Sequence, residues 1–245
     1  MKLELHVHTR YSNDSFLHFW PLYLKCRILK ISCIAITEHN NIQGGLRFRK
    51  FCQDHGNKVQ VIVGEEIFTK DGEIIGLYLT ETIPHHLSAE KTIYEIKKQN
   101  GLVYVPHPFD LKRYQTVLRE KVISDQQMEI DCIEIHNGRN ISDTYDIEQG
   151  KIAEKYGLLP VIGSDAHTWL EVGRNYLEVD KIPVTSKDFI EVIQKADFKK
   201  KGCLKMTHEM TKIAKMIKMI QRGNFDELHR AILKKIKRGQ HSGGL

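Results

Sequence analysis

The chain has 245 residues, of which 41% are hydrophobic and 28% charged, and its formal net charge is +6. These are ordinary globular values that exclude wholesale disorder and a fibrous architecture, and the length suits a single α/β barrel. No run approaches the roughly 20 apolar residues of a membrane span, and the first residues lack the apolar core of a signal peptide, so we expect no membrane partner.

Charge divides the chain into two parts. Residues 199–238 contain 13 Lys and Arg against three acidic residues, whereas the rest of the chain is mildly acidic. We therefore expect a barrel domain over residues 1–198 and a basic helical segment over residues 199–245. The apolar residues Met210, Ile213, Ile217 and Ile220 predict a first tail helix that packs on the barrel, and a second helix is expected after Asn224. We expect this segment to support the barrel rather than to take part in chemistry.

Short β-like runs alternate with helical stretches along the first 198 residues. The predicted strands are Lys2–Thr9, Ile31–Glu38, Val59–Ile67, Glu73–Leu79, Leu102–His107, Cys132–Asn137, Leu159–Gly163 and Asn175–Val179. The predicted helices lie near residues 18–30, 43–55, 88–100, 112–122, 143–156 and 185–195. Several strands are apolar throughout, which is typical of strands buried on both faces, and repeated β–α units indicate a parallel sheet or a barrel.

The five cysteines do not form a recognisable framework. Their number is odd and no two have Cys-x-x-Cys spacing, so neither a disulfide scaffold nor a four-cysteine zinc site is expected. A reducing, cytoplasmic location is the simplest interpretation.

Histidines and carboxylates stand where predicted strands end. They are His6, His8, His39, Glu66, His107, Asp165 and His167. In a β/α barrel the carboxyl ends of the strands meet on one face, where active sites are built. Bringing so many ionisable groups together is costly unless a cation compensates. The sequence therefore predicts a metal site on this face.

The donor set contains imidazole and carboxylate but no thiolate. It suits Zn²⁺, Mn²⁺ or Fe²⁺, with Mg²⁺ also possible, and has more donors than one tetrahedral ion needs. We therefore expect two or three divalent ions. Such ions can generate a hydroxide nucleophile and stabilise the oxygens of a phosphoryl group.

Five motifs in this order resemble those of the PHP family, named after polymerase and histidinol phosphatase. They are His6-Val7-His8-Thr9, Thr37-Glu38-His39-Asn40, Gly64-Glu65-Glu66, His107-Pro108 and Gly163-Ser164-Asp165-Ala166-His167. The resemblance implies a distorted (β/α)7 barrel with two or three metals that hydrolyses phosphoesters.

The resemblance also implies which residues bind metal. His6, His8, Glu66 and Asp165 would hold a first ion. Glu66 would bridge to a second ion bound by His107, and Asp14 would join His39 and His167 at a third. Glu66, Asp165 and His107 are the implied catalytic residues.

Two departures from the family pattern stand out. Glu38 replaces the usual aspartate, and its extra methylene could shift a hydrogen bond to a ligating imidazole. Trinuclear members have a further histidine between the Glu66 and His107 motifs, where this chain offers only His85 and His86, in an apparent loop. His136 is a further strand-end candidate, so the number of ions stays open.

Substrate phosphate needs cationic donors beside the metals. Arg139 and Arg113 follow strand ends and are the candidates, because guanidinium binds phosphate oxygens in pairs. The expected function is hydrolysis of a phosphomonoester or small phosphodiester by a metal-bound hydroxide, and the expected partner is a small phosphorylated substrate.

Two alternatives remain. The basic segment could bind nucleic acid, which would make the protein a nucleic-acid-binding protein or a nuclease. Hydrolysis of C–N bonds, as in amidohydrolase barrels, is less favoured because no lysine stands at a central strand end.

Overall fold

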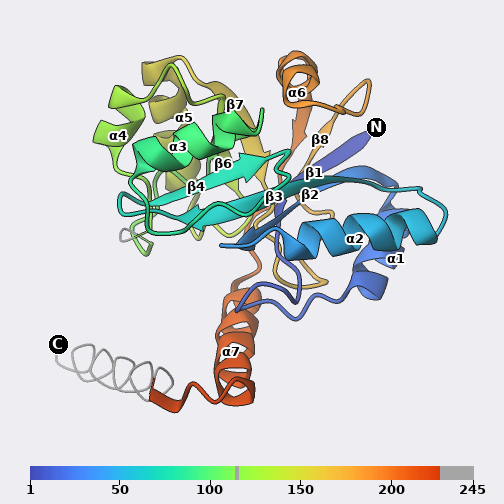
Figure 1. Ribbon diagram of the computed structural model, residues 1–245. Coiled ribbons are helices and arrows are strands. Elements are labelled where there is room, and N and C mark those ends of the chain that lie inside the picture. Colours follow the sequence, from blue (N-terminus) through green and yellow to red (C-terminus); the bar gives the residue numbers. More distant parts are fainter. Residues whose placement is uncertain (114–115, 227–245) are drawn as a thin grey trace.

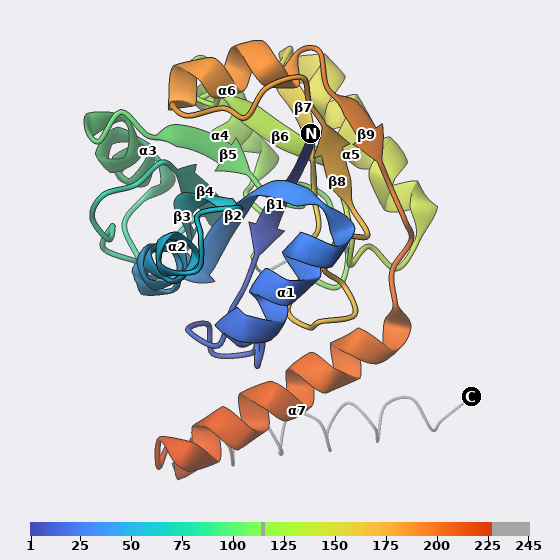
Figure 2. The ribbon, with the colours of Figure 1, turned by 90° about the vertical axis from the view of Figure 1, so that its right-hand side faces the viewer.

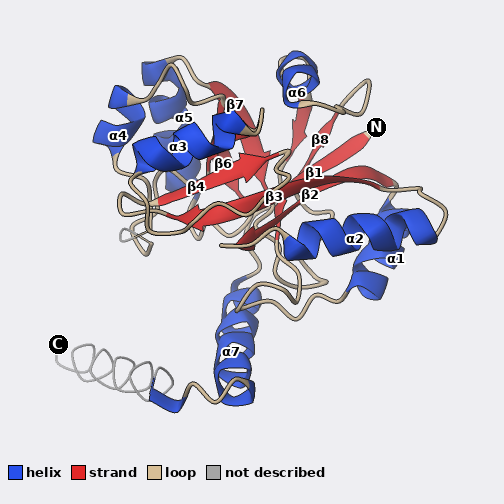
Figure 3. Ribbon diagram, viewed as in Figure 1, coloured by secondary structure: helices blue, strands red, loops and turns tan. Residues whose placement is uncertain are grey.

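The computed structural model describes residues 1–113 and 116–226 (Figure 1). One nine-stranded sheet runs through them in the order β7-β6-β5-β4-β3-β2-β1-β8-β9, with helices on its outside (Figure 3). The strands are β1 (Lys2–Val7), β2 (Ile31–His39), β3 (Gln60–Phe68), β4 (Glu73–Leu77), β5 (Leu102–Val105), β6 (Cys132–Asn137), β7 (Leu159–Gly163), β8 (Tyr176–Glu178) and β9 (Asp197–Lys199). The helices are α1 (Phe19–Leu29), α2 (Gln43–Asp54), α3 (Ala89–Lys98), α4 (Glu120–Asp125), α5 (Asp143–Tyr156), α6 (Ser186–Ile193) and α7 (Lys205–Gln221).

The sheet closes almost completely on itself between β1 and the segment after β7. The amide of Ser164 donates to Leu5 O at 2.9 Å, and the amide of His8 donates to Ala166 O at 2.8 Å. Strands β8 and β9 extend the sheet beyond this closure from the first residues of β1. The architecture is thus the distorted (β/α) barrel that the sequence predicts.

Strand β4 runs opposite to both of its neighbours. Phe68, the last residue of β3, pairs with Glu73, the first residue of β4. Because of this reversal, the start of β4 lies at the edge where β3 ends. A residue at the start of β4 therefore reaches the same face as residues at the ends of the parallel strands.

Apolar side chains fill the barrel and the space under the helices. The interior cluster includes Leu3, Leu5, Ile75 and Tyr104, all fully buried, and α6 adds Phe189 to it. These apolar side chains fill the barrel interior, and polar groups lie at the ends of the parallel strands.

The predicted strands all overlap observed strands, but one predicted helix is wrong. The pattern predicts a helix near residues 112–122, whereas helix α4 spans Glu120–Asp125. The Asp110 carboxylate accepts hydrogen bonds from the amides of Lys112 and Arg113, at 2.8 and 3.2 Å. An aspartate that binds backbone amides two and three residues ahead favours a turn over a helix.

Helix α7 forms as predicted, but its predicted buried face is wrong. The apolar residues Met210, Ile213, Ile217 and Ile220 are between 38% and 56% exposed. The residues of α7 that are buried are instead Thr207, Ala214, Lys218 and Met219. The helix lies apart from those that cover the barrel (Figure 2). The second expected tail helix lies outside the described residues beyond Asp226.

Within the described ranges, no helix has both the length and the apolar character needed to cross a bilayer.

We predict that Gly163→Ala lowers stability, because a methyl group at this position would overlap the buried carboxylate of Glu134. Overpacking of this kind costs about 1–3 kcal/mol. Gly150→Ala in α5 is the matched control: no atom lies within 4 Å of its added Cβ, and alanine favours the helix. Thermal unfolding of both variants checks this, and equal melting temperatures for Gly163→Ala and the parent would contradict it.

Candidate metal centre

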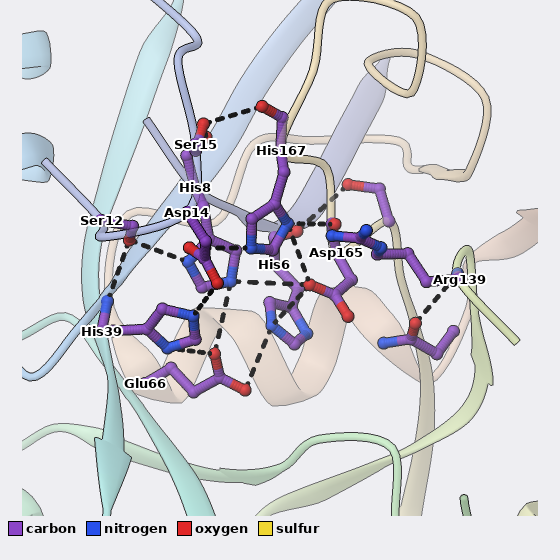
Figure 4. A network of polar contacts seen from close by, with 12 residues as sticks. His6, His8, Ser12, Asp14, Ser15, His39, Glu66, Arg139, Asp165 and His167 are labelled. Atoms are coloured by element: carbon purple, nitrogen blue, oxygen red, sulfur yellow. Dashed lines mark hydrogen bonds and ion pairs between the residues drawn. The ribbon is translucent and has the colours of Figure 1, made fainter. Parts of the chain in front are cut away.

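Side chains from the ends of several strands and the loops after them converge on one buried cluster. His6 comes from β1 and His8 follows it, His39 comes from β2, Glu66 from β3, and Asp165 from the segment after β7 (Figure 4). The eight predicted ligands all lie in this cluster. They are His6, His8, Asp14, His39, Glu66, His107, Asp165 and His167.

The Glu66 carboxylate lies at the centre. Its Oε1 is 3.4 Å from His6 Nε2 and 3.1 Å from His107 Nε2. Its Oε2 is 3.3 Å from His8 Nε2 and 3.0 Å from His39 Nδ1. Each oxygen thus faces a different pair of imidazoles, which is the arrangement of a bridging ligand.

Asp165 is the second shared carboxylate. Its Oδ1 lies 3.7 Å from His6 Nε2 and 3.6 Å from His8 Nε2. Its Oδ2 lies 2.7 Å from Arg113 Nη1. Asp165 therefore faces His6 and His8 with one oxygen and a cation with the other.

Asp14 joins two histidines on the outer side of the cluster. Its Oδ2 is 3.4 Å from His39 Nε2, and its Oδ1 is 3.3 Å from His167 Nε2. Asp14 is about one-fifth exposed, and it lies in the loop between β1 and α1. This group is thus the part of the cluster nearest to solvent.

These separations fit divalent ions. Donors bound at about 2.0–2.2 Å around a tetrahedral ion lie about 3.3 Å from one another. His6 Nε2 and His8 Nε2 are buried and have no hydrogen-bond partner. Three sets of donor atoms could each hold an ion: His8 with His39 and His167, His6 with Glu66 and His107, and His6 with His8 and Asp165.

The electrostatics of the cluster are strongly coupled. Burial alone would raise the pKa of Glu66, but the charges of His6 and His39 hold that pKa well below its usual range. Burial disfavours the His6 imidazolium, yet Asp165 and Glu66 raise its pKa well above the ordinary value. Since a metal needs the neutral imidazole, binding an ion here displaces a proton.

The pKa of His8 shifts in the opposite direction. Burial, and then the charges of His167 and His39, hold the pKa of His8 well below its ordinary value. Its ring is therefore neutral and ready to donate a lone pair at neutral pH.

A buried carboxylate that the sequence analysis did not single out orients His6. Glu134 Oε1 lies 2.7 Å from His6 Nδ1 and accepts a hydrogen bond from the Tyr104 hydroxyl at 2.5 Å. Its Oε2 accepts from the amide of His107 at 2.7 Å. A carboxylate on the far nitrogen of a ligating imidazole fixes its tautomer. In the predicted strand, Glu134 and His136 are two residues apart and share a face, and this was the available signal for Glu134. Only His136 was considered as a ligand.

Glu38 acts on the histidines only indirectly. It accepts hydrogen bonds from the amide and the hydroxyl of Thr9 and from the hydroxyl of Ser12, and Ser12 Oγ lies 3.1 Å from His8 Nδ1. The extra methylene fits because Gly44 leaves room: a Cβ at position 44 would overlap Glu38.

Three predicted ligands occupy strained backbone. His6, His107 and Asp165 have φ values of 63°, 29° and 49°, in the left-handed region that residues with a side chain rarely adopt. Such strain persists where the surrounding structure determines it, and it concentrates at functional sites.

Glu73 is a second residue that the sequence analysis missed. It is buried, and its Oε2 lies 3.5 Å from His107 Nε2. Burial and the nearby charge of Glu66 raise its pKa to about 7. The available signal was the short connection over residues 68–72 with its Asp71-Gly72, because it favours a hairpin, and this reversal of β4 places its first residue at the metal face.

The two arginine candidates differ in their surroundings. Arg113 lies at the cluster beside Asp165 and is about one-quarter exposed. Arg139 is buried, and its Nη2 donates to Thr211 Oγ1 at 2.8 Å, while its Nε lies 3.6 Å from Glu171. Arg113 is therefore the freer of the two to meet a substrate.

His85, His86 and His136, whose role as ligands was left open, have other partners. His136 Nδ1 is 2.5 Å from Asp146, and its Nε2 is 3.1 Å from Asn175. His85 and His86 are exposed in the loop before α3, and their ring centroids lie 4.8 Å apart. Within the described residues, none of the three joins the metal-binding sets.

Comparison with known proteins identifies the family. The family model described as PHP domain matches residues 4–238. The chain belongs to the PHP family, as the five motifs indicate.

A similar protein is an uncharacterized protein of Methanocaldococcus jannaschii, which is 34% identical over 190 residues, 77% of this chain and 74% of the relative. Among solved structures, the fold is similar to a two-domain protein from Bacteroides vulgatus that contains a predicted PHP-like metal-dependent phosphoesterase. That match has a TM-score of 0.62 and 17% identity, and it covers 81% of this chain and 64% of the other. PsfC from Pseudomonas syringae is also similar, with a TM-score of 0.62, 14% identity and coverage of 90% and 98%.

We predict that Glu134→Gln weakens metal binding, because the neutral amide no longer supports His6 as a basic ligand. Losses of about 10–100-fold in affinity are typical for such partners. Glu129→Gln, at an exposed position, is the control. Metal retention during dialysis against graded chelator measures the effect, and retention equal to that of the parent protein would contradict this role.

Proposed function

We propose that this protein is a metal-dependent phosphoesterase that acts on a small phosphorylated substrate. The observation that carries the proposal is the buried Glu66 carboxylate, which faces four imidazoles at 3.0–3.4 Å. Membership of the PHP family supports it, as does the expectation that phosphoester chemistry needs closely spaced cations.

The donors fall into three groups, and Glu66 belongs to the first two. We assign the first ion to His6, His8, Glu66 and Asp165. The second ion belongs with Glu66 and His107, to which we add Glu73. The third belongs with Asp14, His39 and His167.

Divalent ions held here supply two things: they lower the pKa of bound water and neutralise charge on phosphoryl oxygens. The chain's own residues do the rest. Burial of Glu66 and Asp165 excludes competing water, and Glu134 holds the His6 ring in one orientation. Arg113, fixed by Asp165 and Asp110, presents a cation at the cluster's edge and would bind a phosphate oxygen.

We retain a barrel domain over residues 1–198 and a basic segment over residues 199–245 as the proposed division of the chain. The proposed metals are Zn²⁺, Mn²⁺ or Fe²⁺.

The test is a panel of phosphomonoesters, nucleotides and a short oligonucleotide, assayed with each metal restored after chelation. Hydrolysis of small esters supports the proposal; cleavage of the oligonucleotide alone would favour a nuclease, and no hydrolysis with any metal would overturn the function.

We predict that Glu66→Gln abolishes hydrolysis and lowers the metal content by at least one ion per chain. The amide keeps the shape but loses the negative charge that the ions need. Glu65→Gln is the matched control, because the neighbouring Glu65 is also buried but accepts a hydrogen bond from the amide of Ile83 on the other side of β3. Elemental analysis and turnover are measured together. Full activity of Glu66→Gln with its metals retained would contradict the assignment.

We predict that Glu73→Ala removes about one ion per chain after dialysis, since His107 and Glu66 alone hold the second ion weakly. Glu73→His should retain that ion, because imidazole is also a ligand. Exposed Glu81→Ala is the control. Unchanged metal content in Glu73→Ala would remove Glu73 from the ligand set.

A further inference from the structure

A lysine of the C-terminal helix is buried against the loop that carries Asp14. Lys218, in α7, is only 8% exposed. Its Nζ donates to three backbone carbonyl oxygens: Arg10 O at 2.8 Å, Ser12 O at 2.5 Å and Ser15 O at 2.5 Å. An ammonium group has three N–H donors, so all of them are used.

The three acceptors surround Asp14 in sequence. Ser12 and Ser15 lie on either side of it, and the loop has no strand or helix of its own between β1 and α1. Carbonyl oxygens that converge on one point repel each other unless a cation lies between them. Lys218 therefore holds the loop in the curved shape that directs Asp14 toward His39 and His167.

Other contacts join the same loop to the helix and to the cluster. Arg222, one turn beyond Lys218, donates to the side chain of Asn13. Ser15 Oγ donates to His8 O at 2.9 Å and to His167 O at 2.8 Å. The loop is thus bound to α7 on one side and to two predicted metal ligands on the other.

The N-terminal half of α7 contacts the barrel as well. Arg139, after β6, donates to Thr211 Oγ1 at 2.8 Å and to Thr207 O at 3.4 Å. The helix is therefore held at both ends, and its position relative to the barrel is defined.

We infer that Lys218 is a positioning residue for the outermost metal site, and that α7 is thereby part of the metal centre rather than only a support. The inference rests on the proposed function in assigning Asp14, His39 and His167 to an ion. It differs from our expectation that the C-terminal segment takes no part in the chemistry. The side chain never touches the ion; it acts through the loop.

The test is the Mn²⁺ binding isotherm of the full-length chain, with elemental analysis at each plateau. Asp14→Ala identifies the step due to the outer site. Lys218→Met, which keeps the length but loses the donors, should weaken that step about 10–100-fold and leave the tighter steps unchanged. Lys215→Met makes the same change at an exposed position of α7 and should match the parent protein.

A purely structural role would give a different result. If Lys218→Met melts at a lower temperature but its isotherm matches that of the parent, or if it weakens every step equally, the inference is overturned. An isotherm of Asp14→Ala identical to that of the parent would overturn it too, because no outer site would exist. Should Lys218→Met not fold, as judged by circular dichroism, Lys218→Gln is read by the same criteria.

The isotherm is independent of turnover. If the parent protein binds its ions but hydrolyses no phosphoester, only the proposed function is contradicted. The isotherm still decides the inference about Lys218.

Discussion

The carboxylate of Glu66, buried among four imidazoles, is the constraint on which the rest of this structure depends. Removing an ionised carboxylate from water costs much free energy unless positive charge surrounds it. Protonated imidazoles can supply that charge in the absence of metal, as the raised pKa of His6 indicates. Divalent ions supply it better, because every imidazole then donates a lone pair and none has to hold a proton in a desolvated site.

The closed barrel brings these ionisable groups together at one point. Closure between β1 and the segment after β7 brings His6 and Asp165 together although they are far apart in sequence. The left-handed backbone at both residues is the local cost of that approach. The interior apolar cluster and the hydrogen bonds of Glu134 offset this cost.

Much of this could be predicted from the sequence, and the reasons for the failures are physical. Strand-end histidines and carboxylates are visible because β/α repetition fixes where strands end, so seven of the eight ligands could be placed in one cluster. Asp14 lies in a loop and was implied only by the family resemblance. Glu73 was missed although the sequence has a signal for it: residues 68–72 are too few for a crossover to a parallel strand, and Asp71-Gly72 favours a hairpin that reverses β4. Glu134 was missed because a carboxylate that orients a ligand has the same sequence pattern as any buried polar residue.

Helix α7 shows the limit of periodicity most clearly. Its isoleucines suggest an inward face, but the residue that determines its docking is Lys218. A buried lysine is recognisable only once its acceptors are known, and these are backbone carbonyls whose positions depend on a loop some 200 residues earlier in the chain. The pattern in α7 therefore could not reveal that this helix contacts the loop that carries Asp14.

The central claim, that the cluster around Glu66 binds several divalent ions, is tested most directly by anomalous diffraction from crystals grown with Mn²⁺. We predict at least two anomalous peaks in contact with Glu66, one between His6, His8 and Asp165 and one beside His107 and Glu73. A well-ordered cluster with no peak within bonding distance of Glu66, at saturating Mn²⁺ and neutral pH, would contradict the account.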